Sequence, residues 1–95
     1  MSVSGGDSTH ILVSGRVQGV GYRYFAAARA KMHGIVGCVR NLPDGSVEVV
    51  AVGPRVALAY FIGDLERGPS SGRVRSCQVA AIPLTEQFSE FSVRY

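Results

Sequence analysis

Two hydrophobic periodicities alternate along this chain, and their order constrains the fold more than any single motif does. Residues 10–18 (HILVSGRVQ) alternate as a strand does, and residues 22–33 follow with the spacing of a helix. In that second stretch, Phe25, Ala28 and Met32 fall at positions i, i+3 and i+7. The chain is therefore predicted to open with a strand, a short loop and an amphipathic helix.

The middle of the chain is predicted to form a hairpin and a second helix. Strands are expected over residues 35–42 and 46–52, because Pro43-Asp44-Gly45 between them favours a turn. The second helix is expected to begin near Pro54 and to end at Gly68. Its apolar residues lie at i, i+3, i+4 and i+7, namely Leu58, Phe61, Ile62 and Leu65.

Two further strands are predicted near the end of the sequence. One covers residues 73–82, and the other lies within residues 88–95, where Phe91, Val93 and Tyr95 alternate with polar residues. The order is thus strand, helix, strand, strand, helix, strand, with a further short strand. This order matches the split βαβ, ferredoxin-like plan, an α+β sandwich with an antiparallel sheet and two helices on one face.

Composition favours a single small domain. The chain has 95 residues, of which 46% are hydrophobic, and its mean hydropathy is +0.18. A domain of this size cannot cover both faces of a sheet thickly. We assign residues 1–8 to a flexible leader and residues 9–95 to one domain. Because the sequence shows neither a signal-peptide pattern nor a stretch of membrane-spanning length, we expect a cytoplasmic protein.

Charge and cysteine content narrow the possible function classes. The formal net charge is +3, but the Lys and Arg residues are dispersed along the sequence. The charge is therefore as consistent with binding of a small anion as with binding of a polyanion. Cys38 and Cys77 are too few for a disulfide scaffold and have no metal-ligand pattern around them. We interpret both as buried free thiols and expect no metal and no cofactor.

The loop before the first helix carries the most informative pattern, GRVQGVGYR, residues 15–23. Glycines leave backbone N–H groups accessible at a helix N-terminus, which favours an anion, and Arg23 adds a planar set of donors. A dinucleotide fingerprint fails because Tyr24 occupies its third glycine position, and a P-loop fails because no Lys-Ser or Lys-Thr follows. The glycines alone leave open a simple turn with a solvated Arg23.

Two spaced motifs resemble the signatures of the acylphosphatase family. Gly-x-Val-Gln-Gly-Val-x-aromatic-Arg matches residues 15–23, and Gly-x-Val-x-Asn matches residues 37–41. The resemblance implies that Arg23 is the phosphate-binding catalytic residue and that Asn41 orients the attacking water. It also implies that the phosphate oxygens are held by the backbone amides of Gln18, Gly19, Val20, Gly21 and Tyr22.

The reaction that this resemblance implies is hydrolysis of an acyl phosphate to a carboxylate and inorganic phosphate. The conjugate acid of the departing carboxylate has a pKa of about 4, so no general acid is needed. Catalysis of phosphoryl transfer consists largely of positioning and charge stabilisation. We expect a monomer that acts on a small-molecule acyl phosphate, is inhibited by inorganic phosphate, needs no metal, and binds neither nucleic acid nor membrane.

The sequence is also compatible with two alternative functions. A ferredoxin-like module can bind single-stranded nucleic acid through aromatic residues on its sheet, although the interior strands here lack them. An acylphosphatase-like domain can also be the first part of a larger carbamoyl-transfer protein, but a sequence of 95 residues favours the free-standing form. We interpret four other polar residues as structural or solvated rather than catalytic: His10, His33, Asp44 and Glu48.

Overall fold

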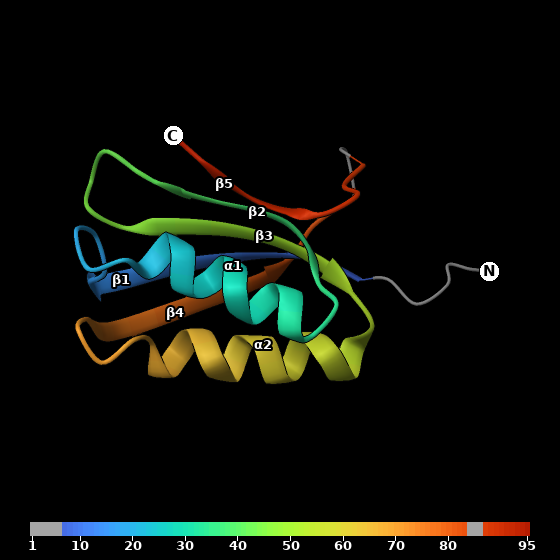
Figure 1. The fold of residues 1–95 in the computed structure, drawn as a ribbon. Coiled ribbons are helices and arrows are strands. Elements are labelled where there is room, and N and C mark those ends of the chain that lie inside the picture. The colour runs from blue at the N-terminus through green and yellow to red at the C-terminus, as the bar shows by residue number, and fades with distance from the viewer. Residues whose placement is uncertain (1–6, 84–86) are drawn as a thin grey trace.

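The computed structural model describes residues 7–83 and 87–95 and arranges them as a sheet with a layer of helices against it (Figure 1). In chain order, the elements are β1 (Asp7–Arg16), α1 (Tyr22–Met32), β2 (Val36–Asn41), β3 (Val47–Gly53), α2 (Arg55–Arg67), β4 (Arg73–Ala81) and β5 (Phe91–Arg94). The predicted order of strands and helices is therefore confirmed.

The sheet has the strand order β4-β1-β3-β2-β5. β1 lies antiparallel to β3 and β4, and β2 lies antiparallel to β3, as predicted. β5 runs parallel to β2, so the expectation of a wholly antiparallel sheet is wrong at this edge. β4 ends and β5 begins at the same end of the sheet (Figure 1), and a chain that crosses there to the opposite edge must return in the direction of β2.

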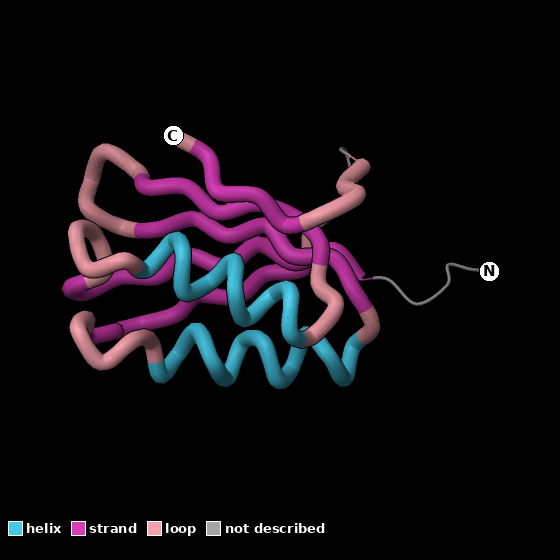
Figure 2. Tube along the Cα trace, viewed as in Figure 1, coloured by secondary structure: helices cyan, strands magenta, loops and turns pink. Residues whose placement is uncertain are grey.

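Both helices cover the same face of the sheet, as predicted, and the opposite face carries no helix (Figure 2). β3 shows how the sequence produces this asymmetry. Val47, Val49 and Ala51 are fully buried, whereas Glu48 and Val50, which alternate with them, are half-buried. The buried set forms one core with Phe61 and Leu65 of α2 and with small residues of α1. The ferredoxin-like α+β plan is thus confirmed.

The buried face of α1 differs from the face that the sequence suggested. Tyr22, Ala26 and Ala30 are buried, whereas Met32 is 70% exposed and Phe25 is half-buried at the flank. Alanines let a helix backbone approach a sheet closely, and the larger apolar residues are then displaced to the sides. Residue size along the helix, rather than hydrophobicity alone, therefore selects the face that packs.

The first strand begins earlier than expected. Asp7 pairs with Gly53 and Ser8 with Val52, so β3 continues to offer hydrogen-bonding partners beyond the predicted domain boundary. The assignment of residues 7 and 8 to a leader is therefore wrong, and residues 1–6 lie outside the described part of the chain. No helix in the described residues is long and apolar enough to span a membrane.

Candidate active site

Residues 17–21, here called the cradle loop, connect β1 to α1. Gly19 and Gly21 have φ values of 76° and 77°, in the left-handed region that glycine adopts without strain. A Cβ atom added at either position would meet no atom within 4 Å. The backbone conformation therefore favours glycine at both positions, although no neighbouring atom would clash with a side chain there.

The N-terminus of α1 presents backbone donors next to this space. Its first main-chain N–H with a carbonyl partner is that of Phe25, which donates to Gly21 at 3.0 Å. The N–H groups of residues 18–22 donate to no atom of the described residues. The first turn of α1 also holds no acidic side chain. Unpaired N–H groups and the positive end of the helix dipole together favour an anion here.

Arg23 stands in the first turn of α1, half-buried, and contacts the end of the chain. Its Nη1 donates to the main-chain oxygen of Arg94 at 3.0 Å, and its guanidinium carbon lies 4.6 Å from the centre of the Tyr95 ring. A guanidinium has five N–H groups in a fixed plane. These contacts orient the side chain and leave further N–H groups for an anion.

Asn41 is the last residue of β2, where the strand enters the hairpin turn. Its Oδ1 is buried and accepts no hydrogen bond from the described residues. A buried acceptor without a partner costs about 1–3 kcal/mol. Such an atom calls for a functional explanation, and a water or ligand hydrogen would satisfy it.

These groups meet at one small cavity of about 100 Å³. The residues lining it are Val17, Gly19, Gly21, Tyr22, Arg23, Tyr24 and Asn41. The structure thus brings Arg23 and Asn41, which lie far apart in the sequence, to the same opening beside the cradle-loop glycines.

Two residues of the predicted site do not line this cavity. The side chain of Gln18 turns toward the hairpin, where its Nε2 donates to the main-chain oxygens of Leu42 and Ser46. Val20 packs against the core, and its main-chain oxygen accepts a hydrogen bond from Ser71 Oγ at 2.8 Å. The side chains of Gln18 and Val20 are therefore directed elsewhere, and these two residues can contact an anion only through their main-chain N–H groups.

The sequence of this chain matches an established family. A family model named acylphosphatase matches residues 9–93. The chain belongs to the acylphosphatase family. An acylphosphatase from Methylococcus capsulatus is 46% identical over 84 residues, which cover 88% of this chain and 91% of that protein. An acylphosphatase from Thermus thermophilus is 54% identical over 68 residues, which cover 72% of this chain and 77% of that protein.

Solved structures of the acylphosphatase family share the fold. The crystal structure of acylphosphatase from Bacillus subtilis matches with a TM-score of 0.88 and 38% sequence identity, over 93% of this chain and 98% of that one. The ferredoxin-like arrangement described above is therefore the one found in a solved acylphosphatase.

Sequence reasoning missed the aromatic side chains around Arg23 in this acylphosphatase-family chain. The hydroxyl groups of Tyr24 and Tyr95 form a hydrogen bond to each other, and Tyr24 lines the cavity. The alternation of residues 88–95 predicted a strand there, but it did not show which strand of the sheet this one would pair with. The pairing of Arg40 with Arg94 in the parallel register brings the end of the chain to the end of β2.

Tyr22 lines the cavity and also links the two helices. Its hydroxyl is buried and donates to the main-chain oxygen of Leu65 in α2 at 2.7 Å. Burial raises the pKa of the Tyr22 phenol well above its usual value of 10.0. The phenol therefore stays protonated and ties the start of α1 to α2.

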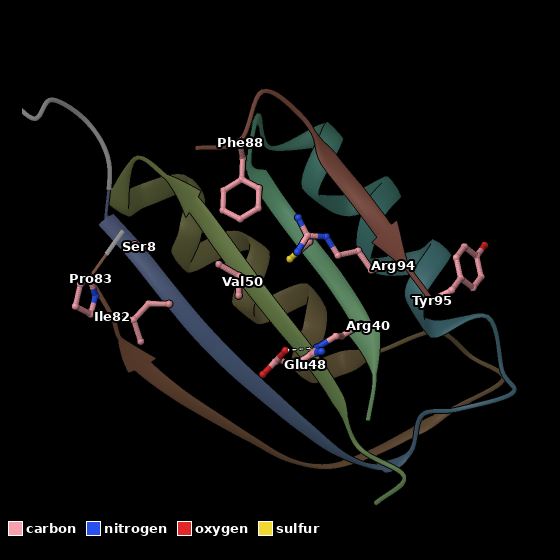
Figure 3. A pocket seen from close by; sticks show the side chains of 10 residues that line it. Ser8, Arg40, Glu48, Val50, Ile82, Pro83, Phe88, Arg94 and Tyr95 are labelled. Atoms are coloured by element: carbon pink, nitrogen blue, oxygen red, sulfur yellow. Dashed lines mark hydrogen bonds and ion pairs between the residues drawn. The ribbon is translucent and has the colours of Figure 1, made fainter. Parts of the chain in front are cut away.

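A larger hollow of about 330 Å³ lies on the helix-free face of the sheet and shares no lining residue with the small cavity (Figure 3). Arg40 and Glu48 line it and are joined by a hydrogen bond of 2.6 Å from Arg40 Nε. Phe88 forms another wall, with the guanidinium carbon of Arg94 5.9 Å from its ring centre. This hollow has none of the cradle-loop donors.

Several titratable side chains outside the cavity contact one another. His10 Nε2 lies 3.0 Å from Glu48, and His33 Nε2 lies 2.8 Å from Asp64. Within residues 7–83 and 87–95, no group of three or more His, Cys, Asp or Glu side chains is arranged to hold a metal ion. Cys38 is buried as expected, whereas Cys77 is only half-buried, and the two do not form a disulfide bond with each other.

Proposed function

We propose that this chain hydrolyses the carboxyl–phosphate anhydride of acyl phosphates at the small cavity, with Arg23 and Asn41 as its catalytic residues. The observation that carries the proposal is the meeting of Arg23, the open space beside Gly19, and an unpartnered Asn41 oxygen at one opening. Membership of the acylphosphatase family supports the same reaction.

The proposed phosphate site consists of backbone and guanidinium donors. The amides of Gln18, Gly19, Val20, Gly21 and Tyr22 surround the phosphoryl oxygens, and Arg23 donates to the same oxygens through N–H groups that Arg94 does not use. Phosphoryl transfer passes through a loose transition state with charge spread over three equatorial oxygens. Preorganised donors around those oxygens lower the barrier without any rearrangement during the reaction.

Asn41 is proposed to place the nucleophile. Its Oδ1 accepts one hydrogen of a water molecule, whose oxygen then forms a bond to phosphorus as the bond from phosphorus to the acyl oxygen breaks. The carboxylate leaves with the electron pair, and a proton of the water passes to solvent. Because the carboxylate is a weak base, no side chain has to protonate it.

The alternatives are less well supported. Nucleic-acid binding on the sheet would need aromatic residues on the central strands, yet the aromatic side chains at the helix-free hollow are Phe88 and Tyr95 from the end of the chain. A role as one module of a carbamoyl-transfer protein is not favoured by relatives named acylphosphatase that this chain covers over most of their own length. We also propose that the protein is a cytoplasmic monomer and that it binds neither nucleic acid nor a membrane.

The direct test is an assay with a generic acyl phosphate such as benzoyl phosphate, with and without a chelator. We expect hydrolysis that is unchanged by the chelator, because Arg23 already supplies the positive charge. Inorganic phosphate is expected to inhibit competitively, since it fills the same donors. Absence of hydrolysis by folded protein, or a rate unaffected by saturating phosphate, would overturn the proposal.

A further inference from the structure

The side chain of Gln18 links the cradle loop to the turn that follows Asn41. Its Nε2 donates to the main-chain oxygens of Leu42 and Ser46, each at 2.8 Å. A primary amide nitrogen carries two hydrogens, so each hydrogen has one acceptor. Both neighbours are carbonyls, so only the orientation with the nitrogen facing them makes both bonds.

The two carbonyls belong to residues 42–46, which form the turn between β2 and β3. Within this turn, the N–H of Leu42 donates to Ser46 at 2.9 Å, and the N–H of Gly45 donates to Leu42 at 3.2 Å. Leu42 directly follows Asn41 in the chain. The Gln18 amide therefore bridges the site from the cradle loop to the peptide next to Asn41.

Asn41 depends on its backbone for its position. Its Oδ1 has no hydrogen-bond partner among the described residues, so no contact of that oxygen fixes it relative to the cradle loop. Among the described residues, hydrogen bonds from two side chains link the cradle loop to other segments: Gln18 bonds to the hairpin turn, and Ser71, which precedes β4, bonds to Val20. Gln18 is the one whose acceptors adjoin Asn41.

We propose that the Gln18 side chain is a positioning residue, which sets the distance between the cradle loop and Asn41 at which Asn41 Oδ1 meets the attacking water. This inference rests on the proposed function, in which Asn41 places that water. The main-chain N–H of Gln18 is a separate group, and every side-chain variant retains it. A displacement of about 1 Å at a reacting centre costs on the order of 100-fold in rate.

The first test is Gln18→Glu, which keeps size and shape but points a carboxylate oxygen at two carbonyls. We expect kcat to fall by about 10- to 100-fold. Because the new carboxylate also repels an anion, phosphate inhibition is measured on the neutral variant Gln18→Met, whose inhibition constant is expected to change by less than about 3-fold. A protonated carboxyl regains one donor. The ratio of variant to wild-type kcat is therefore expected to rise as the pH falls below about 5.

The second test is a double-mutant cycle with Asn41→Ala. If Gln18 acts through Asn41, Gln18→Glu lowers kcat by less than about 3-fold further in the Asn41→Ala background. Ser71→Ala is the matched control, because it removes the other side-chain bond to the cradle loop. Its effect on kcat is expected to be the same fold-change in both backgrounds. Gln18→Met, which is neutral and has no donor, replaces Gln18→Glu if the latter does not fold.

Several results would overturn the proposal. Equal loss of kcat from Gln18→Glu in both backgrounds would show that Gln18 does not act through Asn41. An inhibition constant for phosphate that rises in Gln18→Met as much as kcat falls would place the effect of Gln18 on anion binding. A normal kcat for Asn41→Ala alone would overturn the proposed role of Asn41 and this inference with it, and is distinguishable because it involves no change at Gln18.

Discussion

Gly19 is the residue that best separates an anion-binding loop from an ordinary turn. Its φ of 76° strains any residue with a Cβ, and the space beside it is empty of protein atoms. Gly19→Val is expected to lower kcat/KM by at least about 10-fold, because the side chain enters the space that a phosphoryl group needs. The cost in stability is expected to be about 1–3 kcal/mol.

The measurement pairs steady-state kinetics with urea unfolding of the same preparation. Gly34→Val is a suitable control, since Gly34 also has a positive φ with open space beside it but lies after the C-terminal end of α1. A Gly19→Val protein with normal kinetics and normal phosphate inhibition would show that Gly19 serves only the turn.

At the scale of single residues, the sequence predicts which residues are candidates for the site but not all of their contacts. The glycine pattern, Arg23 and Asn41 were predictable as candidates because their motif carries them at fixed spacing. The side-chain bonds of Gln18 and the contact of Arg23 with Tyr95 were not predictable. Both join segments that are distant in the sequence, and no local periodicity encodes such pairs.

At the scale of elements, the two helices are joined by a buried carboxylate that sequence reasoning did not single out. The side chain of Asp64 in α2 is 7% exposed and forms ion pairs with His33, Arg29 and Arg67. Asp64→Asn is expected to lower the free energy of unfolding by about 1–2 kcal/mol, a modest value because its partners are partly solvated.

Chemical denaturation at neutral pH measures this effect, with Glu66→Gln on the exposed side of the same helix as the control. Activity of the folded Asp64→Asn protein is expected to match that of the wild type, because Asp64 does not line the small cavity beside Arg23. An unchanged unfolding midpoint would show that these ion pairs do not hold the helices together.

Elements were predictable in kind and order, but not in every relation to their neighbours. Alternation and helical spacing, with Pro and Gly at their ends, predicted each helix and strand of the described residues. The parallel direction of β5 and the buried face of α1 were not predictable. The first depends on the path of the connection after β4, and the second depends on how closely alanines let α1 approach the sheet.

For the molecule as a whole, Glu48 couples stability to pH. It lies on β3 between His10 of β1 and Arg40 of β2. Burial raises the pKa of Glu48, but hydrogen bonds from His10 and Arg40 outweigh it, so the pKa lies below its ordinary value of 4.5. A lowered pKa means that the folded state favours the carboxylate. Its stabilisation is complete above about pH 5 and is lost as the pH falls through the folded-state pKa.

Glu48→Gln is therefore expected to be less stable than the wild type by about 1 kcal/mol near pH 7, and the difference is expected to be smaller near pH 3. Urea unfolding at the two pH values tests this expectation, with Glu90→Gln, at an exposed position, as the control. A stability difference that stays constant across the range would assign the effect of Glu48 to packing rather than to its charge.

The central claim is that Arg23 and Asn41 do different work in one cavity. Arg23 is proposed to hold phosphate in the ground state and the transition state, whereas Asn41 is proposed to hold only the attacking water. The decisive measurement is kcat together with the competitive inhibition constant of inorganic phosphate, for folded Arg23→Ala and folded Asn41→Ala.

We predict that Arg23→Ala weakens phosphate inhibition and lowers kcat/KM by on the order of 100-fold or more, and that Arg23→Lys restores little because an ammonium lacks the planar fork. Asn41→Ala is predicted to lower kcat steeply while phosphate inhibition stays within about 3-fold of wild type. A near-normal kcat for Asn41→Ala, or loss of phosphate inhibition as complete as in Arg23→Ala, would contradict the account.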